Sequence, residues 1–241
     1  NAIAAHYSAE DALVFVSGHA TNVSTISALM QEGDLILHDS LIHNSIVVGS
    51  QLSGASRRSF RHNDMQALTK LLEENRSRYK NALVVVEGLY SMDGDLAPLD
   101  ELVALRDRFS FWLMVDEAHS LGCVGKLGLG SFEHFGVDPN RIDIWMGTLS
   151  KTLASTGGYI AGSEALIDIL KSHASSFVYS VGLPPALAAA AKEALKLLHE
   201  QPDRTAKLQD NSGYFLDIAK KSGLDCGESD GFSVIPVMIG D

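Results

Sequence analysis

The stretch Gly147-Thr148-Leu149-Ser150-Lys151-Thr152 decides how the rest of this sequence is interpreted. It follows an apolar run, Ile142–Met146, that is typical of a buried strand. A lysine close to the end of a buried strand loses hydration, which disfavours its ammonium form, and a neutral amine can form a Schiff base with an aldehyde. The neighbouring hydroxyl groups and glycines can hold a phosphate at the same place. Taken alone, the stretch fits a surface lysine in a loop better, so the interpretation depends on the motifs upstream.

The composition limits the classes of function. The chain has 241 residues, 46% of them hydrophobic, and its net charge of −11 argues against a nucleic-acid-binding surface. Two cysteines, Cys123 and Cys226, provide neither a disulfide framework nor enough ligands for a structural zinc site. No apolar stretch reaches the length of a membrane span, and we find no signal peptide. We therefore expect a soluble, cytoplasmic protein without a metal; because the sequence does not begin with methionine, we also expect it to be part of a longer chain.

Short apolar runs alternate with segments of helical periodicity, which is typical of an α/β fold with a mainly parallel sheet covered by helices. The seven runs expected to form strands are Ala12–Val16, Leu35–Leu37, Arg57–Phe60, Leu83–Val86, Trp112–Val115, Ile142–Met146 and Tyr159–Ala161. Between them, helix starts can be recognised. Asn63 with Gln66 three residues later resembles a capping box, and Pro98 precedes an acidic first turn.

The last quarter of the chain differs from this alternating pattern. An alanine-rich run, Ala186–Leu198, predicts a long helix that leads out of the first domain. Beyond it we expect another helix and then a strand, Val234–Ile239, which begin a second, small domain. We therefore place the major domain at 1–183, and the interdomain helix with the beginning of the minor domain at 184–241.

A second apolar strand runs directly into Asp116, and His119 follows three residues later. In open parallel sheets, ligands bind beyond the carboxyl ends of the strands. A carboxylate there can pair with a cationic ring nitrogen, provided that the pair is well aligned. The alternative is that Asp116 only caps the next helix and His119 only packs. The letters D-E-A-H also occur in helicases, but the phosphate-binding loop that such a protein needs is absent from this sequence.

Three further strand ends carry polar residues. Gly18 and His19 begin a helix, where backbone amides can bind an anion. His43 follows the next strand and could stack on a planar ligand, although a histidine in an exposed first turn is the commoner case. Ser91 offers a hydroxyl after a later strand, where Asp93 and Gly94 can equally form a simple turn.

Six motifs then follow one another in the order found in the α-oxoamine synthases: S-G-H-A-T-N, I-H-N-S, R-H-N-D, E-G-L-Y-S-M-D-G-D, V-D-E-A-H-S-L-G and G-T-L-S-K. The similarity covers nearly the whole chain, and the serine palmitoyltransferase and 8-amino-7-oxononanoate synthase branches resemble it most. The 2-amino-3-ketobutyrate CoA ligases belong to the same family. The resemblance implies a three-layer α/β/α fold, the type I fold of transferases that depend on pyridoxal 5'-phosphate (PLP), with a mostly parallel seven-stranded sheet.

The resemblance also implies roles for the catalytic and ring-binding residues. Lys151 would bind the cofactor through a Schiff base and later move the Cα proton of the substrate. Asp116 would keep the pyridine nitrogen protonated, so that the ring acts as an electron sink. His119 and Ser91 would lie near the phenolic oxygen of the ring, and His43 would stack on its face.

The phosphate of the cofactor would be held by Thr148 together with the backbone amides of Gly18 and His19. Two residues here depart from the family pattern. His19 stands where relatives usually have an aromatic residue, and Thr152 follows the lysine where a smaller residue is common.

The segment Tyr179–Pro185 resembles the part of the family fold that reaches into a partner subunit, so the resemblance implies a homodimer. Relatives usually have a hydroxyl residue at the position of Val181, where it touches the phosphate bound by the neighbouring subunit. That contact is therefore in doubt in this chain, unless Ser180 replaces it.

The family's activity is the decarboxylative condensation of an amino acid with an acyl thioester, carried by coenzyme A or by an acyl-carrier protein, to give an α-amino ketone. The alternatives are a fold-type I aminotransferase and a non-catalytic, PLP-sensing regulator. Three arginines, Arg57, Arg58 and Arg61, could meet a coenzyme A phosphate, but an exposed edge strand explains them equally well. The stretch Gly227–Gly231 matches the hydrolase motif G-x-S-x-G, but its surroundings predict a loop.

Overall fold

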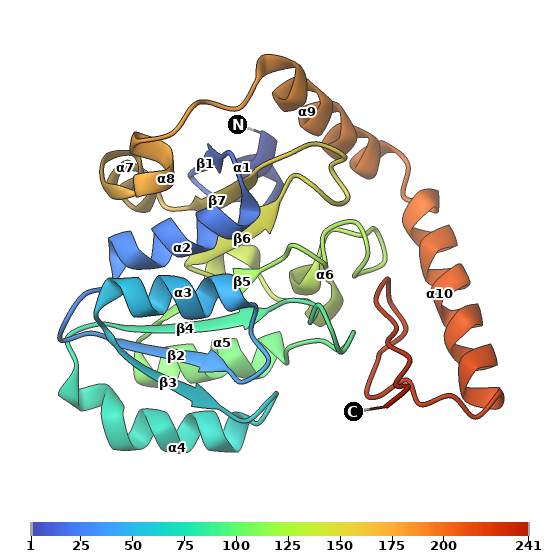
Figure 1. Cartoon of the computed structure of the whole chain (residues 1–241), viewed down its shortest axis with the longest axis horizontal. Helices are drawn as coiled ribbons and strands as arrows, with labels where there is room; N and C mark the ends of the chain where they lie inside the picture. Colours follow the sequence, from blue (N-terminus) through green and yellow to red (C-terminus); the bar gives the residue numbers. More distant parts are fainter. Residues whose placement is uncertain (1, 241) are drawn as a thin grey trace.

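The computed structural model describes residues 2–240 and is built around one seven-stranded sheet (Figure 1). The strands are β1 (Asp11–Phe15), β2 (Leu35–Asp39), β3 (Ser56–Phe60), β4 (Ala82–Glu87), β5 (Trp112–Asp116), β6 (Ile144–Thr148) and β7 (Gly158–Gly162). They lie in the order β1-β7-β6-β5-β4-β2-β3. Only β7 runs antiparallel to its neighbours, so the prediction of a mostly parallel seven-stranded sheet is confirmed.

Helices cover both faces of this sheet and make the fold three-layered (Figure 1). The α-helices are α1 (Ala2–His6), α2 (Gly18–Leu29), α3 (Asn44–Ser53), α4 (Met65–Asn75), α5 (Leu99–Phe109), α6 (Ser131–Phe135), α7 (Glu164–His173), α8 (Ser175–Val178), α9 (Pro185–Glu200) and α10 (Asp203–Lys221); two short 3₁₀ turns are η1 (Arg76–Arg78) and η2 (Pro139–Arg141).

Strand β4 shows why the sequence produces two separate cores. All six of its residues are buried, as is typical of a parallel strand covered on both faces. Because side chains alternate along a strand, Val84 and Val86 join the core cluster beneath α1, α4, α5 and α9. Leu83 and Val85 join the other cluster, beneath α2, α3 and α7.

The strand predicted over Val234–Ile239 is wrong. The segment makes only an isolated bridge, between Asp225 and Met238. Pro236 lies in the middle of the segment and has no N–H group to donate to a ladder, so an apolar composition alone does not produce a strand.

The capping box predicted at Asn63 is also wrong. The N-cap of α4 is Asp64, whose side chain accepts a hydrogen bond from Ala67 N at 2.9 Å. Asn63 instead lies just outside the helix with φ of +50°, and its side chain donates hydrogen bonds to Asp95 and to the carbonyl oxygen of Leu96.

The other helix predictions are confirmed. Helix α9 contains the predicted Ala186–Leu198, and α5 begins after Pro98 with two acidic residues in its first turn. Helices α9 and α10 lie along one side of the molecule (Figure 1). No helix within residues 2–240 is long and apolar enough to cross a membrane. The division into domains at residue 183 stays a prediction.

A buried histidine in α1 gives the fold a predictable acid sensitivity. His6 Nε2 contacts the carbonyl oxygen of Leu129 at 2.9 Å, and Nδ1 lies 3.1 Å from Nε2 of His199. Burial, aided by His199 and opposed by the Leu129 contact, lowers the pKa of His6 from 6.5 to about 4. Between these pH values the unfolded chain binds a proton that the folded chain does not bind, so the free energy of unfolding falls as the pH falls.

We expect the wild-type protein to lose about 3 kcal/mol more than a His6→Gln variant between pH 6.5 and pH 4, from the ~1.4 kcal/mol that each pKa unit represents. Urea unfolding at several pH values measures the difference. His173→Gln is the control, because His173 is exposed on α7. Identical pH dependence in wild type and His6→Gln would show that His6 is not buried in its neutral form.

Candidate active site

The carboxyl ends of β4, β5 and β6 meet at one edge of the sheet, where a pocket of about 260 Å³ opens. It is lined by Ser17, Gly18, His19, Asn22, His43, Ser45, Glu87, Asp116, Ala118, His119, Met146, Thr148, Ser150 and Lys151. The fold therefore brings all the predicted site residues except Ser91 to one place. Residues from five separate stretches of sequence converge there, as expected beyond the strand ends of an open α/β sheet.

Asp116, the last residue of β5, carries the buried carboxylate of this pocket. Its Oδ1 accepts a hydrogen bond from Ala118 N at 3.0 Å, and its Oδ2 accepts one from Asn22 Nδ2 at 2.9 Å. Burial raises the pKa of Asp116, because the charged form is poorly solvated there. In the part of the chain that the structure describes, no basic side chain lies close enough to form an ion pair with it.

Lys151 lies three residues beyond the end of β6, and its amine faces His119 across the pocket mouth. The distance from Lys151 Nζ to His119 Nε2 is 2.5 Å. Burial, with the nearby charge of Lys151 as a smaller cause, lowers the pKa of His119 to about 4, so the ring is neutral at pH 7 and accepts this hydrogen bond. Desolvation lowers the pKa of Lys151, against the opposing charges of Asp116 and Glu87. The prediction that this lysine has a lowered pKa agrees with the structure, although the side chain is more exposed than a buried strand end suggested.

His43 caps the start of α3 at the opposite side of the pocket. Its Nδ1 lies 2.7 Å from the hydroxyl of Ser45, which in turn accepts a hydrogen bond from Asn22 Nδ2 at 3.0 Å. Since Asn22 also binds Asp116, one chain of hydrogen bonds joins the buried carboxylate to the exposed imidazole. Sequence analysis assigned no role to Asn22 or Ser45, although both belong to quoted motifs. Asn22 lies one turn into α2 and Ser45 is the second residue of α3; both are buried, which their positions in the sequence did not indicate.

Glu87 is a second buried carboxylate that sequence analysis missed. It pairs with Asp116 in the parallel register of β4 and β5, and it accepts hydrogen bonds from His43 N at 2.7 Å and Ser91 N at 3.1 Å. Burial and then the charge of Asp116 raise the pKa of Glu87 to about 8. The strand-end rule that found Asp116 applies equally to Glu87, so this residue could have been predicted. Ser91 does not line the pocket, but its amide is fixed through Glu87.

Small residues and hydroxyl groups form the end of the pocket at the start of α2. A side chain at Gly18 would place its Cβ 3.0 Å from the hydroxyl of Thr148, so glycine permits the helix start to approach β6. The Thr148 hydroxyl lies 2.7 Å from that of Ser150. Hydroxyl groups beside the amino end of a twelve-residue helix are suited to an anion.

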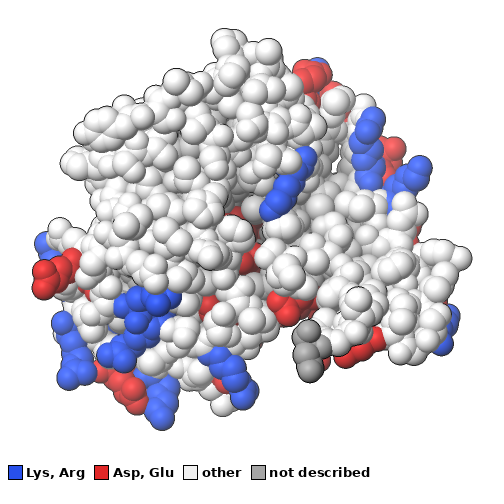
Figure 2. Space-filling model, viewed as in Figure 1, with Lys and Arg blue, Asp and Glu red and all other residues white. Residues whose placement is uncertain are grey.

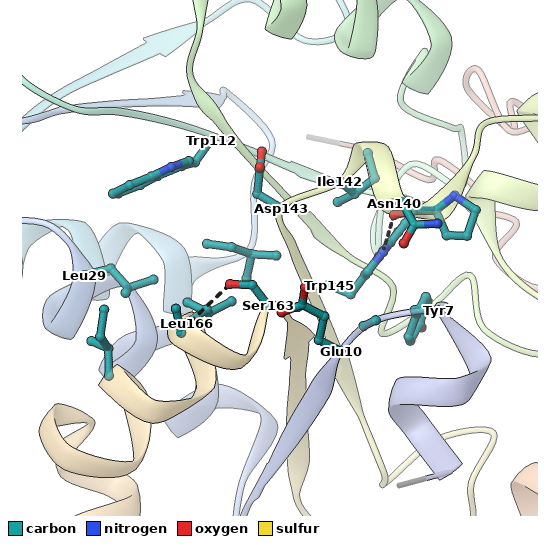
Figure 3. Close-up of a pocket in the computed structure, with 16 residues that line it drawn as sticks. Tyr7, Glu10, Leu29, Trp112, Asn140, Ile142, Asp143, Trp145, Ser163 and Leu166 are labelled. Carbon is teal, nitrogen blue, oxygen red and sulfur yellow. Dashed lines mark hydrogen bonds between the residues drawn. The ribbon is translucent and has the colours of Figure 1, made fainter.

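A larger hollow of about 370 Å³ lies at the opposite edge of the sheet, where β5 and β6 begin (Figure 3). Leu29, Trp112 and Leu166 face it. Its acidic groups are already engaged: Asp143 accepts hydrogen bonds from Arg106 at 2.5 and 2.7 Å, and Glu10 accepts one from the amide of Glu164 at 2.8 Å. This hollow therefore lacks the free reactive groups that the pocket around Lys151 has.

Basic side chains are unevenly spread over the face seen in Figure 2, with most of them at the lower left over β3 and α4. Arg57, Arg58 and Arg61 are exposed in this region, on an edge strand and in the loop that follows it. The pocket around Lys151 is not part of this basic area.

A mixed sheet of this order, with a lysine after β6 and a buried aspartate at the end of β5, defines the fold-type I class of PLP-dependent transferases, as predicted. The chain belongs to the family of class I and II aminotransferases, whose pattern matches residues 1–241.

Among curated relatives, the 8-amino-7-oxononanoate synthase of Treponema denticola is 43% identical over 96% of this chain and 58% of its own length. That of Alkaliphilus metalliredigens is 40% identical over 99% of this chain and 60% of its own length. The chain thus spans about three fifths of the relatives that it matches.

Two solved structures have a closely similar fold. Serine palmitoyltransferase from S. paucimobilis, with a bound PLP–myriocin aldimine, superposes with a TM-score of 0.94 at 31% identity, over 100% of this chain and 62% of that one. The 8-amino-7-oxononanoate synthase of Francisella tularensis superposes with a TM-score of 0.85 at 29% identity, over 99% of this chain and 68% of that one. The resemblance to the α-oxoamine synthases is thereby confirmed.

Proposed function

We propose that this chain carries the cofactor site of a PLP-dependent C-acyltransferase, which condenses an amino acid with an acyl thioester, releases carbon dioxide and forms an α-amino ketone. The observation that carries the proposal is the pair of reactive groups in one pocket: Asp116, a buried carboxylate that forms no ion pair within residues 2–240, and Lys151, a lysine of lowered pKa. The names of the relatives support the reaction class.

The residues present fit PLP. A buried carboxylate that no described basic side chain neutralises is poorly stabilised by itself, and a protonated pyridine nitrogen would supply the missing charge. At the other end, Gly18 leaves room beside Thr148 that a larger residue would fill. We infer that the phosphate lies here, between the amino end of α2 and the hydroxyl groups of Thr148 and Ser150.

When bound, PLP supplies an electron sink for the negative charge that develops at the substrate's α-carbon. The protein's part is to position the groups around it. Asp116 would hold the ring nitrogen, His43 would cover one face of the ring, and His119 would lie near its phenolic oxygen. Ser91 does not line the pocket; its amide is fixed to Glu87, and its contact with the same oxygen stays a prediction.

Lys151 is the group that we propose to move a proton in this pocket. Its lowered pKa increases the fraction of neutral amine near pH 7, which both nucleophilic attack and proton abstraction require. The neutral ring of His119 accepts a hydrogen bond from Lys151 Nζ and thereby orients the amine. Glu87 holds the loops of His43 and Ser91 in place through two hydrogen bonds, so it stabilises the shape of the pocket.

The test is a paired product assay. The purified protein with PLP is incubated with glycine, alanine or serine and with acyl-CoA thioesters of several lengths, and free thiol and carbon dioxide are measured together. We expect equal amounts of both, because each condensation releases one of each. Transfer of the amino group to a 2-oxo acid without release of thiol would instead assign the chain to the aminotransferases.

We also propose that the protein works as a homodimer, and that the acyl donor is carried by coenzyme A or by an acyl-carrier protein. Two side chains of the Tyr179–Pro185 segment support the dimer, because Tyr179 is 88% exposed and Val181 is 80% exposed in the single chain. The domain boundary at residue 183 is part of the same proposal. The cytoplasmic location stays a prediction from composition.

Val181 provides the test of this arrangement. If Val181 faces the phosphate of the neighbouring subunit, Val181→Thr should tighten PLP binding by about 0.5–1.5 kcal/mol, the net contribution of one added hydrogen bond. Titration of the cofactor-free protein with PLP measures this, and sedimentation determines the oligomeric state. Unchanged affinity would show that the side chain points elsewhere, and a monomer that binds PLP tightly would contradict the dimer itself.

A further inference from the structure

The motif Arg61-His62-Asn63-Asp64 has no place in the proposed reaction, yet it forms a dense network of hydrogen bonds behind the pocket. His62 lies between two carboxylates, with Nδ1 2.9 Å from Asp39 Oδ1 and Nε2 2.8 Å from Asp95 Oδ2. Asp39 is fully buried and Asp95 is nearly so. Where both carboxylates are ionised they only accept hydrogen bonds, so each ring nitrogen donates one and His62 is an imidazolium.

Asn63 makes the same connection a second time. Its backbone N donates to Asp39 Oδ2 at 2.9 Å, and its side chain donates to Asp95 Oδ2 at 2.8 Å and to Leu96 O at 2.9 Å. Asn63 has φ of +50°, a conformation that costs free energy in any residue except glycine. In this conformation Asn63 binds both Asp39 and Asp95, and Asp64 is the N-cap of α4.

The two acids belong to the two loops that lead to the pocket. Asp39 ends β2 and its Oδ1 also accepts a hydrogen bond from Leu41 N at 2.8 Å, two residues before His43. Asp95 closes the loop that contains Ser91, since its carbonyl oxygen accepts a hydrogen bond from Tyr90 N at 2.9 Å. On the pocket side, Glu87 joins the same two loops.

The loop that contains Ser91 also supports the C-terminal segment. Asp230 Oδ2 accepts a hydrogen bond from Leu96 N at 3.0 Å, and Asp230 N donates to Gly94 O at 3.1 Å. A side chain at Gly94 would place its Cβ 2.1 Å from Val234 O, so the two backbones are in direct contact. Figure 1 shows this red segment next to the loops at the carboxyl edge of the sheet.

We propose that His62 is a positioning residue: its imidazolium joins the loop of His43 to the loop of Ser91 and so fixes both at the cofactor pocket. The claim about the cofactor rests on the proposed function, whereas the claim about the loops does not. The groups that face His62 are Asp39, Asp95, the side-chain amide of Asn63, whose Nδ2 lies 3.5 Å from Nε2, and the edge-on ring of Tyr90, at 4.5 Å between centroids. Arg61 pairs with Asp64 instead.

Because His62 must be protonated to bind both carboxylates, the connection between the two loops is sensitive to alkaline pH. Burial opposes the charge, but Asp39 and then Asp95 outweigh burial and raise the pKa of His62 above 6.5. The stabilisation is therefore complete below pH 6.5 and is lost as the pH rises through the raised pKa. Above the raised pKa the imidazole is neutral and has one N–H group, so only one of the two carboxylates keeps a donor from the ring.

The test compares His62→Gln, which has no charge, with His62→Arg, which keeps a permanent charge and several donors. His173→Gln, on the exposed surface of α7, is the control. Hydrogen–deuterium exchange of the cofactor-free protein is measured at Leu41, His43 and Ser91, whose amides are hydrogen-bonded in the loops. We expect these amides to exchange about tenfold faster in His62→Gln, ~1.4 kcal/mol, while amides within β5 keep their rates.

His62→Arg should restore slow exchange of these amides, and their exchange should stay slow at high pH. The exchange rates of the wild type should approach those of His62→Gln as the pH rises. PLP affinity should follow the same order, about tenfold weaker in His62→Gln. Unchanged exchange in the loops, or equally faster exchange throughout the sheet, would overturn the proposal. A wild-type protein that does not bind PLP would contradict the proposed function, while the exchange rates would still decide the role of His62.

Discussion

Replacing Lys151 by alanine should lower the rate of condensation by at least about a thousandfold, the upper part of the range for loss of a positioned acid–base group. The reason is that Lys151 is the amine that faces both the buried Asp116 and the neutral His119. The fold should be unaffected, because the side chain is exposed. Initial rates of thiol release measure the loss.

Two further measurements make this prediction specific. Borohydride reduction of the wild-type protein with PLP, followed by peptide mapping, should place a pyridoxyl label on Lys151, and no label should remain in Lys151→Ala. Lys70→Ala is the control, since Lys70 is exposed on α4 away from the pocket, and it should keep both rate and label. A label on another lysine, or full activity in Lys151→Ala, would refute the assignment.

The sheet and most of the pocket could be predicted because both depend on local patterns. Short apolar runs between helical segments predicted every strand, with boundaries correct to within two residues, as β5 shows at Trp112–Asp116. Parallel strands place their carboxyl ends at one edge, so polar residues after several strands had to meet there. Asp116, Lys151 and Thr148 were found by this rule before any family was considered.

Apart from Glu87, the parts of the site that were missed depend on contacts between distant residues. Asn22 and Ser45 appear as ordinary helix residues in the sequence, and only the packing of α2 on α3 joins them to Asp116 and His43. No periodicity indicates such a chain of hydrogen bonds, because each link depends on the rotamer of one side chain.

The two local errors have a related cause. Asn63 and Gln66 satisfied the spacing of a capping box, but the side chain of Asn63 binds Asp95, more than 30 residues away. Val234–Ile239 has the composition of a strand, but a strand exists only where another strand accepts its hydrogen bonds. Local propensity was overridden in both places by tertiary partners.

Asp116→Asn should have the second largest effect, and it separates the role of the carboxylate in catalysis from its effect on stability. An amide keeps the shape of the side chain but cannot neutralise a cationic ring nitrogen. Removing one partner of a buried charged pair costs about 3–5 kcal/mol, so we expect the condensation rate to fall by roughly 10²–10³-fold or more. In addition, the new NH₂ group faces a donor, because Asn22 Nδ2 and Ala118 N both donate to the present carboxylate.

The cofactor-free protein should respond differently. Burial raises the pKa of Asp116, so the charged form is disfavoured in the folded protein without PLP. Removing the charge should offset the cost of turning the new NH₂ group toward a donor, so the melting temperature should be unchanged. With PLP, the wild type should gain more stability than the variant, because only the wild type offers the cofactor a counter-charge. Asp100→Asn, on the exposed surface of α5, is the control and should match wild type in both states. If Asp116→Asn bound PLP and turned over like the wild type, Asp116 would not be the partner of the ring nitrogen; a lower melting temperature without PLP would show that its carboxylate stabilises the fold itself.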